Sequence, residues 1–283
     1  MAHVKKELHI IHTYGLGDSI MLLNSLDALS NEDKHNVSVL TNERVVCEYM
    51  MIKNVDVHYL SLVKIVKYII LTKISKNNLS VMRSFGGTGL KNYLIGLFFK
   101  LFNINYEWKV TDSVEPIPFS VRSSKNTALL KRFFNIVDTP PRCKEFPVFL
   151  GLNPNRKQFK SSNPCNVLIH FGAGDSLKKS LNDKIKKNIV DYYENSKAVN
   201  RIFLLKGPRD ENIAIEPSSK ITLLGNKTPF SLRELIELAK NVDICACNDT
   251  GIGHLMAYEG AKIDLWINGD SGSLIHQVLP NNI

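Results

Sequence analysis

Two glycine-containing junctions, one in each half of the chain, carry the residue types that could do chemistry. The first is segment 13–19 (TYGLGDS), which follows the strand-like run 7–13 and precedes a helical run over residues 20–29. Its glycines allow a tight turn, and Asp18 falls in the first turn of the helix, at the carboxyl end of the strand. Because a helix N-terminus stabilises a carboxylate, Asp18 could accept a proton from a hydroxyl group. The alternative interpretation is that Asp18 only caps its helix.

The second junction is segment 248–254 (NDTGIGH), directly after the apolar run 242–247. Glycines at a helix start let backbone N–H groups approach an anion, and the helix dipole favours the negative charge. Thr250 adds a hydroxyl, and His254 lies one turn later, where its ring could donate to a phosphate oxygen. Asp249 could orient a sugar hydroxyl or the loop itself. The alternative is a capped helix with a hydrogen-bonded core histidine.

A third segment, 170–179 (HFGAGDSLKK), also follows a strand-like run. A glycine-rich turn beside lysines suits a pyrophosphate, although the same residues would also serve as a solvated loop. The sequence contains neither a P-loop signature nor Asp-x-Asp, which argues against a metal-chelated nucleotide site. Charge on a leaving diphosphate would then fall to Lys178, His254 and helix N-termini, with no metal. A dinucleotide fingerprint is incomplete, because isoleucine stands at position 20 where its third glycine would be.

The elements that must position these segments alternate along the chain, strand-like runs with helix-length amphipathic runs. This alternation predicts an α/β fold with parallel sheets and helices on both faces. The expected strands are 7–13, 37–40, 55–60, 79–84, 166–170, 201–205, 220–224, 242–247 and 262–267. The expected helices are 20–29, 43–51, 90–102, 127–137, 182–195, 251–258, which Gly260 should stop, and a helix that a Ser231–Glu234 capping box opens and that runs to residue 239. The polar segment 151–164 is interpreted as a linker, which gives domains 1–152 and 163–283.

Composition limits the function classes. The 283 residues are 44% hydrophobic and 22% charged, as in globular proteins, and are enough for two cores. Lysine plus arginine number 36 against 27 acidic residues, a net charge of +9 that suits nucleic acid, anionic lipid or a phosphorylated substrate. The basic residues are dispersed and no nucleic-acid-binding module appears, so no nucleic-acid partner is expected. Five scattered cysteines, no signal peptide and no apolar run long enough for a membrane span predict a reduced, cytoplasmic protein.

The order of these motifs resembles the bacterial ADP-heptose:lipopolysaccharide heptosyltransferase family over nearly the whole chain. The matching segments are 15–18 (GLGD), 170–173 (HFGA), 178–179 (KK), 205–208 (LKGP), 224–228 (LGNKT), 231–235 (SLREL) and 248–254 (NDTGIGH). The resemblance implies a GT-B architecture, in which two Rossmann-like parallel-sheet domains face a central cleft. The N-terminal domain would bind the acceptor and the C-terminal domain the nucleotide-sugar donor.

The resemblance also implies roles for single residues. Asp18 would be the general base of an inverting, metal-independent transfer that needs no cofactor besides its co-substrate, ADP-heptose. Residues matched to the donor side are Lys178, Asp249, Thr250, Gly251, His254, Phe230 and Ser231. On the acceptor side we expect Gly17, with Arg83 and Lys91 flanking the glycine-rich loop 86–89. These basic residues suit an acidic or lipid-linked glycan, such as the lipopolysaccharide core, at the inner face of the cytoplasmic membrane.

One departure from the family pattern leaves other functions open. Ser180-Leu181 stands where the family has Trp-Pro. A GT-B transferase with another nucleotide sugar, acting in capsule, O-antigen or protein glycosylation, would carry the same motifs. A sugar-nucleotide epimerase should bring several carboxylates and a histidine to the sugar, whereas only Asp18 is well placed here. An inactive nucleotide-sugar binder would have little reason to keep Asp18, Lys178 and His254 together.

Overall fold

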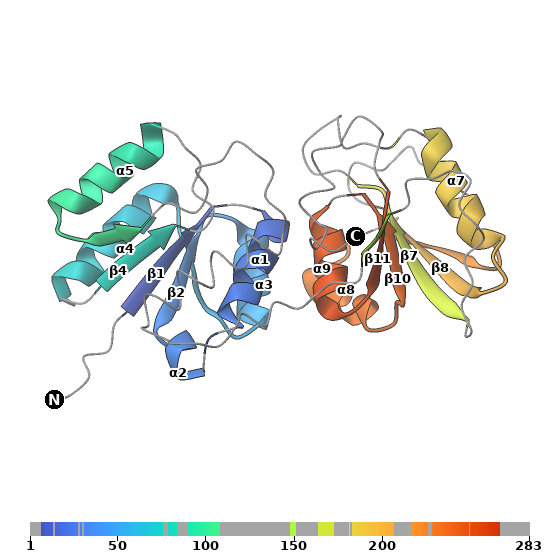
Figure 1. The fold of residues 1–283 in the computed structure, drawn as a ribbon, viewed down its shortest axis with the longest axis horizontal. Helices are drawn as coiled ribbons and strands as arrows, with labels where there is room; N and C mark the ends of the chain where they lie inside the picture. Colours follow the sequence, from blue (N-terminus) through green and yellow to red (C-terminus); the bar gives the residue numbers. More distant parts are fainter. Residues whose placement is uncertain are drawn as a thin grey trace. The chain divides into compact units, whose positions relative to one another are not determined.

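A computed structural model of the chain divides it into two compact units, unit 1 (Met1–Cys143) and unit 2 (Lys144–Ile283), each built on one parallel sheet (Figure 1). The structure describes residues 7–13, 15–27, 29, 31–75, 79–83, 90–107, 148–150, 164–172, 181, 183–206, 215, 217–225, 228–248 and 250–266. Each unit is an α/β layer structure, as the alternation in the sequence predicts.

Within the described residues, unit 1 has a five-stranded sheet in the order β3-β2-β1-β4-β5. Its strands are β1 (Glu7–His12), β2 (Val37–Thr41), β3 (Asp56–Tyr59), β4 (Leu79–Arg83) and β5 (Asn105–Glu107). All four pairings are parallel. β1 lies in the middle and is buried along almost its whole length, as expected for a strand covered by helices on both faces.

The helices of unit 1 form two layers. They are α1 (Leu16–Leu26), α2 (Asn31–Lys34), α3 (Arg44–Ile52), α4 (Leu62–Ser75) and α5 (Leu90–Leu101). α1 packs against α3 on one side of the sheet, and α4 and α5 lie on the other side (Figure 1). The second layer is held by one apolar cluster in which Ile65 and Ile69 of α4 and Phe99 of α5 pack on the strands.

Unit 2 has a six-stranded parallel sheet among its described residues, in the order β6-β11-β10-β7-β8-β9. Its strands are β6 (Val148–Leu150), β7 (Cys165–His170), β8 (Val199–Leu205), β9 (Ile221–Leu224), β10 (Ile244–Cys247) and β11 (Lys262–Leu265). Its helices are α7 (Asp183–Glu194), α8 (Leu232–Ala239) and α9 (Gly251–Glu259). α8 packs against α9 on one side of the sheet, and α7 covers the other (Figure 1).

The expected strands and most expected helices are confirmed, with ends that differ by a few residues. α1 begins at Leu16, four residues before the predicted start. β6 pairs with β11 and so belongs to unit 2, although residues 148–150 precede the expected linker and fall within the expected first domain. The expected helix 127–137 and residues 151–163 of the linker lie outside the described residues.

Local sequence signals fix the ends of α8 and α9. Ser231 caps α8: its Oγ accepts from Glu234 N at 3.3 Å, and Glu234 Oε2 accepts from Ser231 N at 2.8 Å. Hydrogen bonds from the hydroxyl and backbone of Ser231 lower the pKa of the Glu234 carboxyl. Gly260 ends α9 with φ of 113°, a left-handed conformation that glycine adopts without strain. The predicted capping box and the predicted glycine stop are therefore both confirmed.

A close approach of α9 to β10 requires glycine at position 253. A Cβ atom built there would lie 2.6 Å from Cys247 Sγ, and both residues are buried. We expect Gly253→Ala to lower the free energy of unfolding by about 1–3 kcal/mol in urea, because the added methyl must displace α9 or the thiol. Cys247→Ala removes the sulfur, so Gly253→Ala should cost less than half as much in that background. An equal cost in both backgrounds would show that this contact is not the reason.

Candidate functional site

Unit 1 places Asp18 where open α/β sheets bind ligands. Such sites lie beyond the carboxyl ends of the strands, at the point where the winding of the chain reverses. The chain runs from β1 through β2 to β3 and then crosses back to β4, so the reversal falls between β1 and β4. Ile11 pairs with Arg83, which brings the ends of these two strands side by side. α1 and α5 follow β1 and β4, so both begin at this edge.

The turn that carries Asp18 is tight and borders open space. Gly15 is the N-cap of α1, and Asp18 is the acidic residue of the first turn, half-buried. Ser19 closes the turn: its N–H donates to Gly15 O at 3.1 Å and its Oγ to Leu16 O at 2.6 Å. Apart from its chain neighbours, no atom of the described residues would lie within 4 Å of a Cβ atom at Gly15. The carboxylate thus sits at a helix N-terminus, in the turn that Gly15 caps.

His12, the last residue of β1, contacts this turn from the sheet. Its side chain is fully buried, and its ring hydrogen-bonds to the backbone of Gly15. Burial lowers the pKa of His12 to about 4, against the weaker, opposite effect of that hydrogen bond, so the imidazole is neutral at pH 7. His12 was not among the predicted site residues. The signal in the sequence was a histidine at the carboxyl end of an apolar strand, shortly before the glycine turn.

The other predicted acceptor-side residues share this edge as far as their backbone shows. Gly17 is the second residue of α1, Arg83 ends β4, and Lys91 is the second residue of α5. The side chains of Arg83 and Lys91 lie outside the described part of the structure. The structure brings the backbones of these segments to one edge of the sheet, and their contacts with an acceptor remain a prediction.

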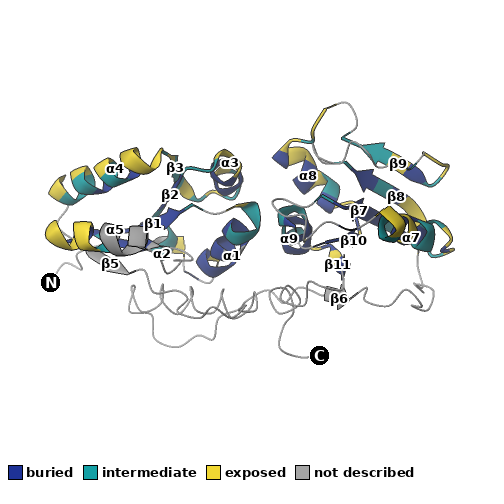
Figure 2. Cartoon of the chain, turned by 90° about the horizontal axis from the view of Figure 1, so that it is seen from above, coloured by how far each residue is buried: buried dark blue, intermediate teal, exposed yellow. Residues whose placement is uncertain are grey.

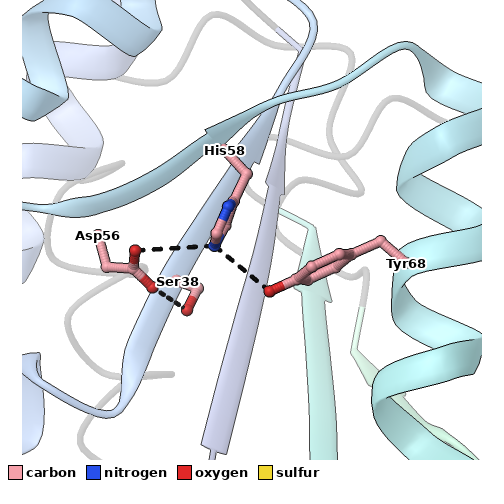
Figure 3. A network of polar contacts seen from close by, with 4 residues as sticks. All are labelled: Ser38, Asp56, His58 and Tyr68. Atoms are coloured by element: carbon pink, nitrogen blue, oxygen red, sulfur yellow. Dashed lines mark hydrogen bonds and ion pairs between the residues drawn. The ribbon is translucent and has the colours of Figure 1, made fainter.

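A second polar cluster in unit 1 lies near the amino ends of β2 and β3 (Figure 3). Ser38 Oγ donates to Asp56 Oδ2, His58 Nε2 lies 3.7 Å from Asp56 Oδ1, and Tyr68 OH lies 3.3 Å from His58 Nε2. The residue types are those of a hydrolase triad, but the serine hydroxyl donates to the carboxylate and has no contact with the imidazole in Figure 3. The cluster joins β3 to α4 and does not activate a nucleophile.

Unit 2 places two of the predicted segments at its own reversal point. The chain runs from β7 through β8 to β9, and α8 then carries it back to β10 on the other side of β7. His170 pairs with Cys247 at the carboxyl ends of β7 and β10. Asn248 Nδ2 donates to Phe171 O at 3.3 Å, which ties the segments after the two strands together. The structure therefore joins the glycine-containing segments that begin at residues 170 and 248.

The N-terminus of α9 is arranged as an anion site would be. Thr250 is its N-cap, and Thr250 Oγ1 accepts from Gly253 N at 3.2 Å. His254 N donates to Thr250 O at 3.1 Å, so the half-buried histidine stands one turn above the cap. The N–H groups of a helix's first turn have no partner within the helix and attract negative charge. Thr250, Gly251 and His254 are thus brought together as predicted, and their contact with phosphate stays a prediction.

The remaining donor-side residues are less completely described. Phe230 is half-buried and Ser231 exposed, at the start of α8, which begins like α9 at the carboxyl end of the sheet. The Ser231 hydroxyl serves the predicted capping box, and its place near the ribose stays a prediction. Lys178 and Asp249 lie outside the described residues.

The described ranges contain neither a candidate metal centre nor a candidate membrane span. No group of three or more His, Cys, Asp or Glu side chains there could hold a metal ion. Among the helices of these ranges, none combines the length and apolar content that a bilayer crossing requires. Metal independence remains a prediction of the sequence.

Comparison with known proteins identifies the fold. No protein-family model matches the sequence, and no curated protein matches it either. Among solved structures, E. coli heptosyltransferase WaaC with ADP is similar over 96% of this chain and 90% of that one, with TM-score 0.62 and 13% identity. A glycosyl transferase of family 9 from Veillonella parvula is similar over 92% and 80%, with TM-score 0.61 and 13% identity. The dodecameric E. coli heptosyltransferase TibC, in complex with ADP-D-beta-D-heptose, is similar over 99% of this chain and 64% of that one, with TM-score 0.51 and 9% identity.

These likenesses establish the fold of the chain. Two α/β units with parallel sheets, matched over nearly their whole length to glycosyltransferases, have the GT-B fold. The predicted fold class is confirmed.

The buried neutral His12 predicts how stability depends on pH. Its folded-state pKa lies below the unfolded value of 6.5, so the unfolded chain binds the extra proton more readily. Stability should therefore fall as pH drops from about 6.5 to about 4, by up to about 3 kcal/mol. His12→Gln should flatten this loss in urea unfolding measured at several pH values, and the exposed His35 provides the control variant, His35→Gln. A pH dependence that is unchanged in His12→Gln would contradict the assignment.

Proposed function

We propose that this protein is an inverting glycosyltransferase that moves a sugar from a nucleotide diphosphate donor to a hydroxyl of a bacterial surface glycan. One observation carries the proposal: each unit presents, at the reversal point of its sheet, the chemical group that such a transfer needs there. Unit 1 presents the carboxylate of Asp18, and unit 2 presents the N-terminus of α9. The GT-B fold adds support, because the two solved structures with TM-scores of 0.61 and 0.62 reported above are glycosyltransferases.

The acceptor side depends on Asp18. As the acceptor oxygen attacks the anomeric carbon from the side opposite the diphosphate, its proton passes to the Asp18 carboxylate. The bond between the anomeric carbon and the diphosphate oxygen breaks, and the configuration at that carbon is inverted. The neutral His12, hydrogen-bonded to the backbone of Gly15, is compatible with this role, because it adds no positive charge to the turn that would lower the basicity of the carboxylate.

The donor side depends on α9. The leaving nucleoside diphosphate keeps the electron pair of the broken bond and gains negative charge. N–H groups at the start of α9, the His254 ring and Lys178 would stabilise that charge, with Asp249 at the sugar and Phe230 and Ser231 near the nucleoside. In this proposal no metal ion takes part, and the nucleotide sugar is the sole co-substrate.

For the donor we propose ADP-heptose, and for the acceptor the core of lipopolysaccharide. The motif order supports the donor, and two of the compared structures contain ADP and ADP-D-beta-D-heptose. Arg83 and Lys91, together with Gly17, support an acidic or lipid-linked acceptor on the unit 1 side. Such an acceptor would place the enzyme in the cytoplasm, at the inner face of the membrane.

The role of Asp18 is tested by Asp18→Asn. We expect transfer, measured as kcat/KM with donor and acceptor, to fall by about 10²–10⁴-fold, because an amide cannot take the proton. ADP affinity should stay within about twofold of wild type, since unit 2 holds the nucleotide in this proposal. Asp27→Asn is the control, because Asp27 is an exposed carboxylate at the other end of the same helix. Transfer at a near-normal rate in Asp18→Asn would remove Asp18 from the mechanism.

The donor site is tested by ADP binding to variants of Thr250. Thr250→Ala removes the cap of α9, which should lower stability by about 1 kcal/mol and weaken ADP binding roughly tenfold. Thr250→Ser keeps the hydroxyl and should restore both. Calorimetry with ADP and UDP measures the affinities, and ADP-heptose then tests the donor. Equal ADP affinity in Thr250→Ala and wild type would place the phosphates elsewhere, and a preference for UDP would change the donor.

A further inference from the structure

The outer side of α4 and α5 is unusually apolar for a surface of this chain. Both helices pack on the same side of the sheet through Ile65, Ile69 and Phe99, so their other sides face outward (Figure 2). We define the outer apolar face by the six side chains Val63, Leu71, Ile74, Leu97, Leu101 and Phe102, which are 80%, 55%, 76%, 42%, 83% and 44% exposed. A helix that is apolar all round is normally covered by a core or by lipid.

The face continues into a hollow on α4. Its volume is about 420 Å³, and among the described residues it is lined by Val63, Val66, Lys67, Ile70 and Leu71. These positions follow the spacing of one helix side, opposite Ile65 and Ile69. The apolar side chains thus form one continuous strip along the helix.

The charged residues of these two helices are all lysines. α4 carries Lys64, Lys67 and Lys73, and α5 carries Lys91 and Lys100. Neither helix contains an aspartate or glutamate, although the chain has 27 of them in 283 residues. Lysine stems can lie along an apolar surface while their ammonium groups reach outward to a negative layer.

We infer that the outer apolar face of α4 and α5 docks on the surface of an anionic lipid bilayer. A bilayer supplies both halves of the complement: hydrocarbon for the apolar side chains and negative headgroups for the lysines. A second copy of the chain would set lysines against lysines, which disfavours that occupant. α1 and Asp18 lie on the other layer of unit 1, so docking leaves them uncovered. The inference does not rest on the proposed function.

The test is flotation of the full chain with vesicles of phosphatidylglycerol and phosphatidylethanolamine, compared with vesicles of phosphatidylcholine alone. The wild-type chain should float with the anionic vesicles and much less with the neutral ones. Val63→Ser with Ile74→Ser removes two exposed apolar side chains and should weaken binding about tenfold or more. Lys64→Gln with Lys67→Gln should weaken it roughly 25-fold, at about fivefold per lysine.

Two matched control variants test whether vesicle binding depends on this face rather than on overall charge or on any exposed apolar side chain. Met51→Ser removes an apolar side chain that is 63% exposed on α3, in the other layer of unit 1. Lys184→Gln with Lys187→Gln removes two exposed charges from α7 in unit 2. Both controls should bind anionic vesicles within about twofold of wild type. Unchanged unfolding temperatures would show that all variants fold.

Three outcomes would overturn the inference. They are no flotation of the wild type, equal loss of binding in the controls, and a dimer that the Val63 and Ile74 variant dissociates in the absence of lipid. The last would assign the face to a second copy of the chain. ADP binding, measured on the same variants, should be unchanged. Failure of the donor proposal and failure of the docking proposal would therefore be seen separately.

Discussion

Parallel strand pairing beside one central buried strand is the constraint on which both units depend. In a parallel sheet each strand is joined to the next by a crossover. The crossover helices therefore begin at the carboxyl edge of the sheet. Where the winding reverses, between β1 and β4 and between β7 and β10, two successive crossovers leave in opposite directions. The helix starts on either side of that gap then present their N–H groups toward one place. In unit 1 this position holds the Asp18 carboxylate, and in unit 2 it holds the capped, glycine-containing N-terminus of α9.

The polar groups buried beneath these edges hold them in place. The His12 ring hydrogen-bonds to the backbone of Gly15, and Asn248 Nδ2 donates to Phe171 O. On β11, the buried Asp264 accepts hydrogen bonds from Tyr193 OH on α7 and from Trp266 Nε1, the latter at 3.0 Å. In a low-dielectric interior a polar group that loses its partner is costly, so each pair allows one arrangement of its segments. These few contacts therefore add to the apolar core in fixing the described segments at the sheet edges.

Structural features that depend on neighbouring residues could be predicted from the sequence, whereas those that depend on distant parts of the chain could not. The glycine turns, the Ser231–Glu234 box and the stop at Gly260 are determined by neighbouring residues, and all were predicted. α4 was missed because its apolar residues surround the helix and leave no 3.6-residue period. β5 and β6 are three-residue edge strands, defined by a partner distant in the chain. The support that His12 gives to the Asp18 turn is likewise a packing relation, which spacing alone does not contain.

The directions of α4 and α5 connect the apolar face with the carboxyl edge of unit 1. Both helices begin after the carboxyl ends of their strands and run back along the sheet, so the face starts at the edge where Asp18 lies. α4 has 14 residues and is therefore about 21 Å long. A bilayer docked along it would bring its headgroups to that edge. Asp18 lies in the first turn of α1, in the other helix layer at that same edge, so a bilayer on α4 and α5 would leave its carboxylate in water.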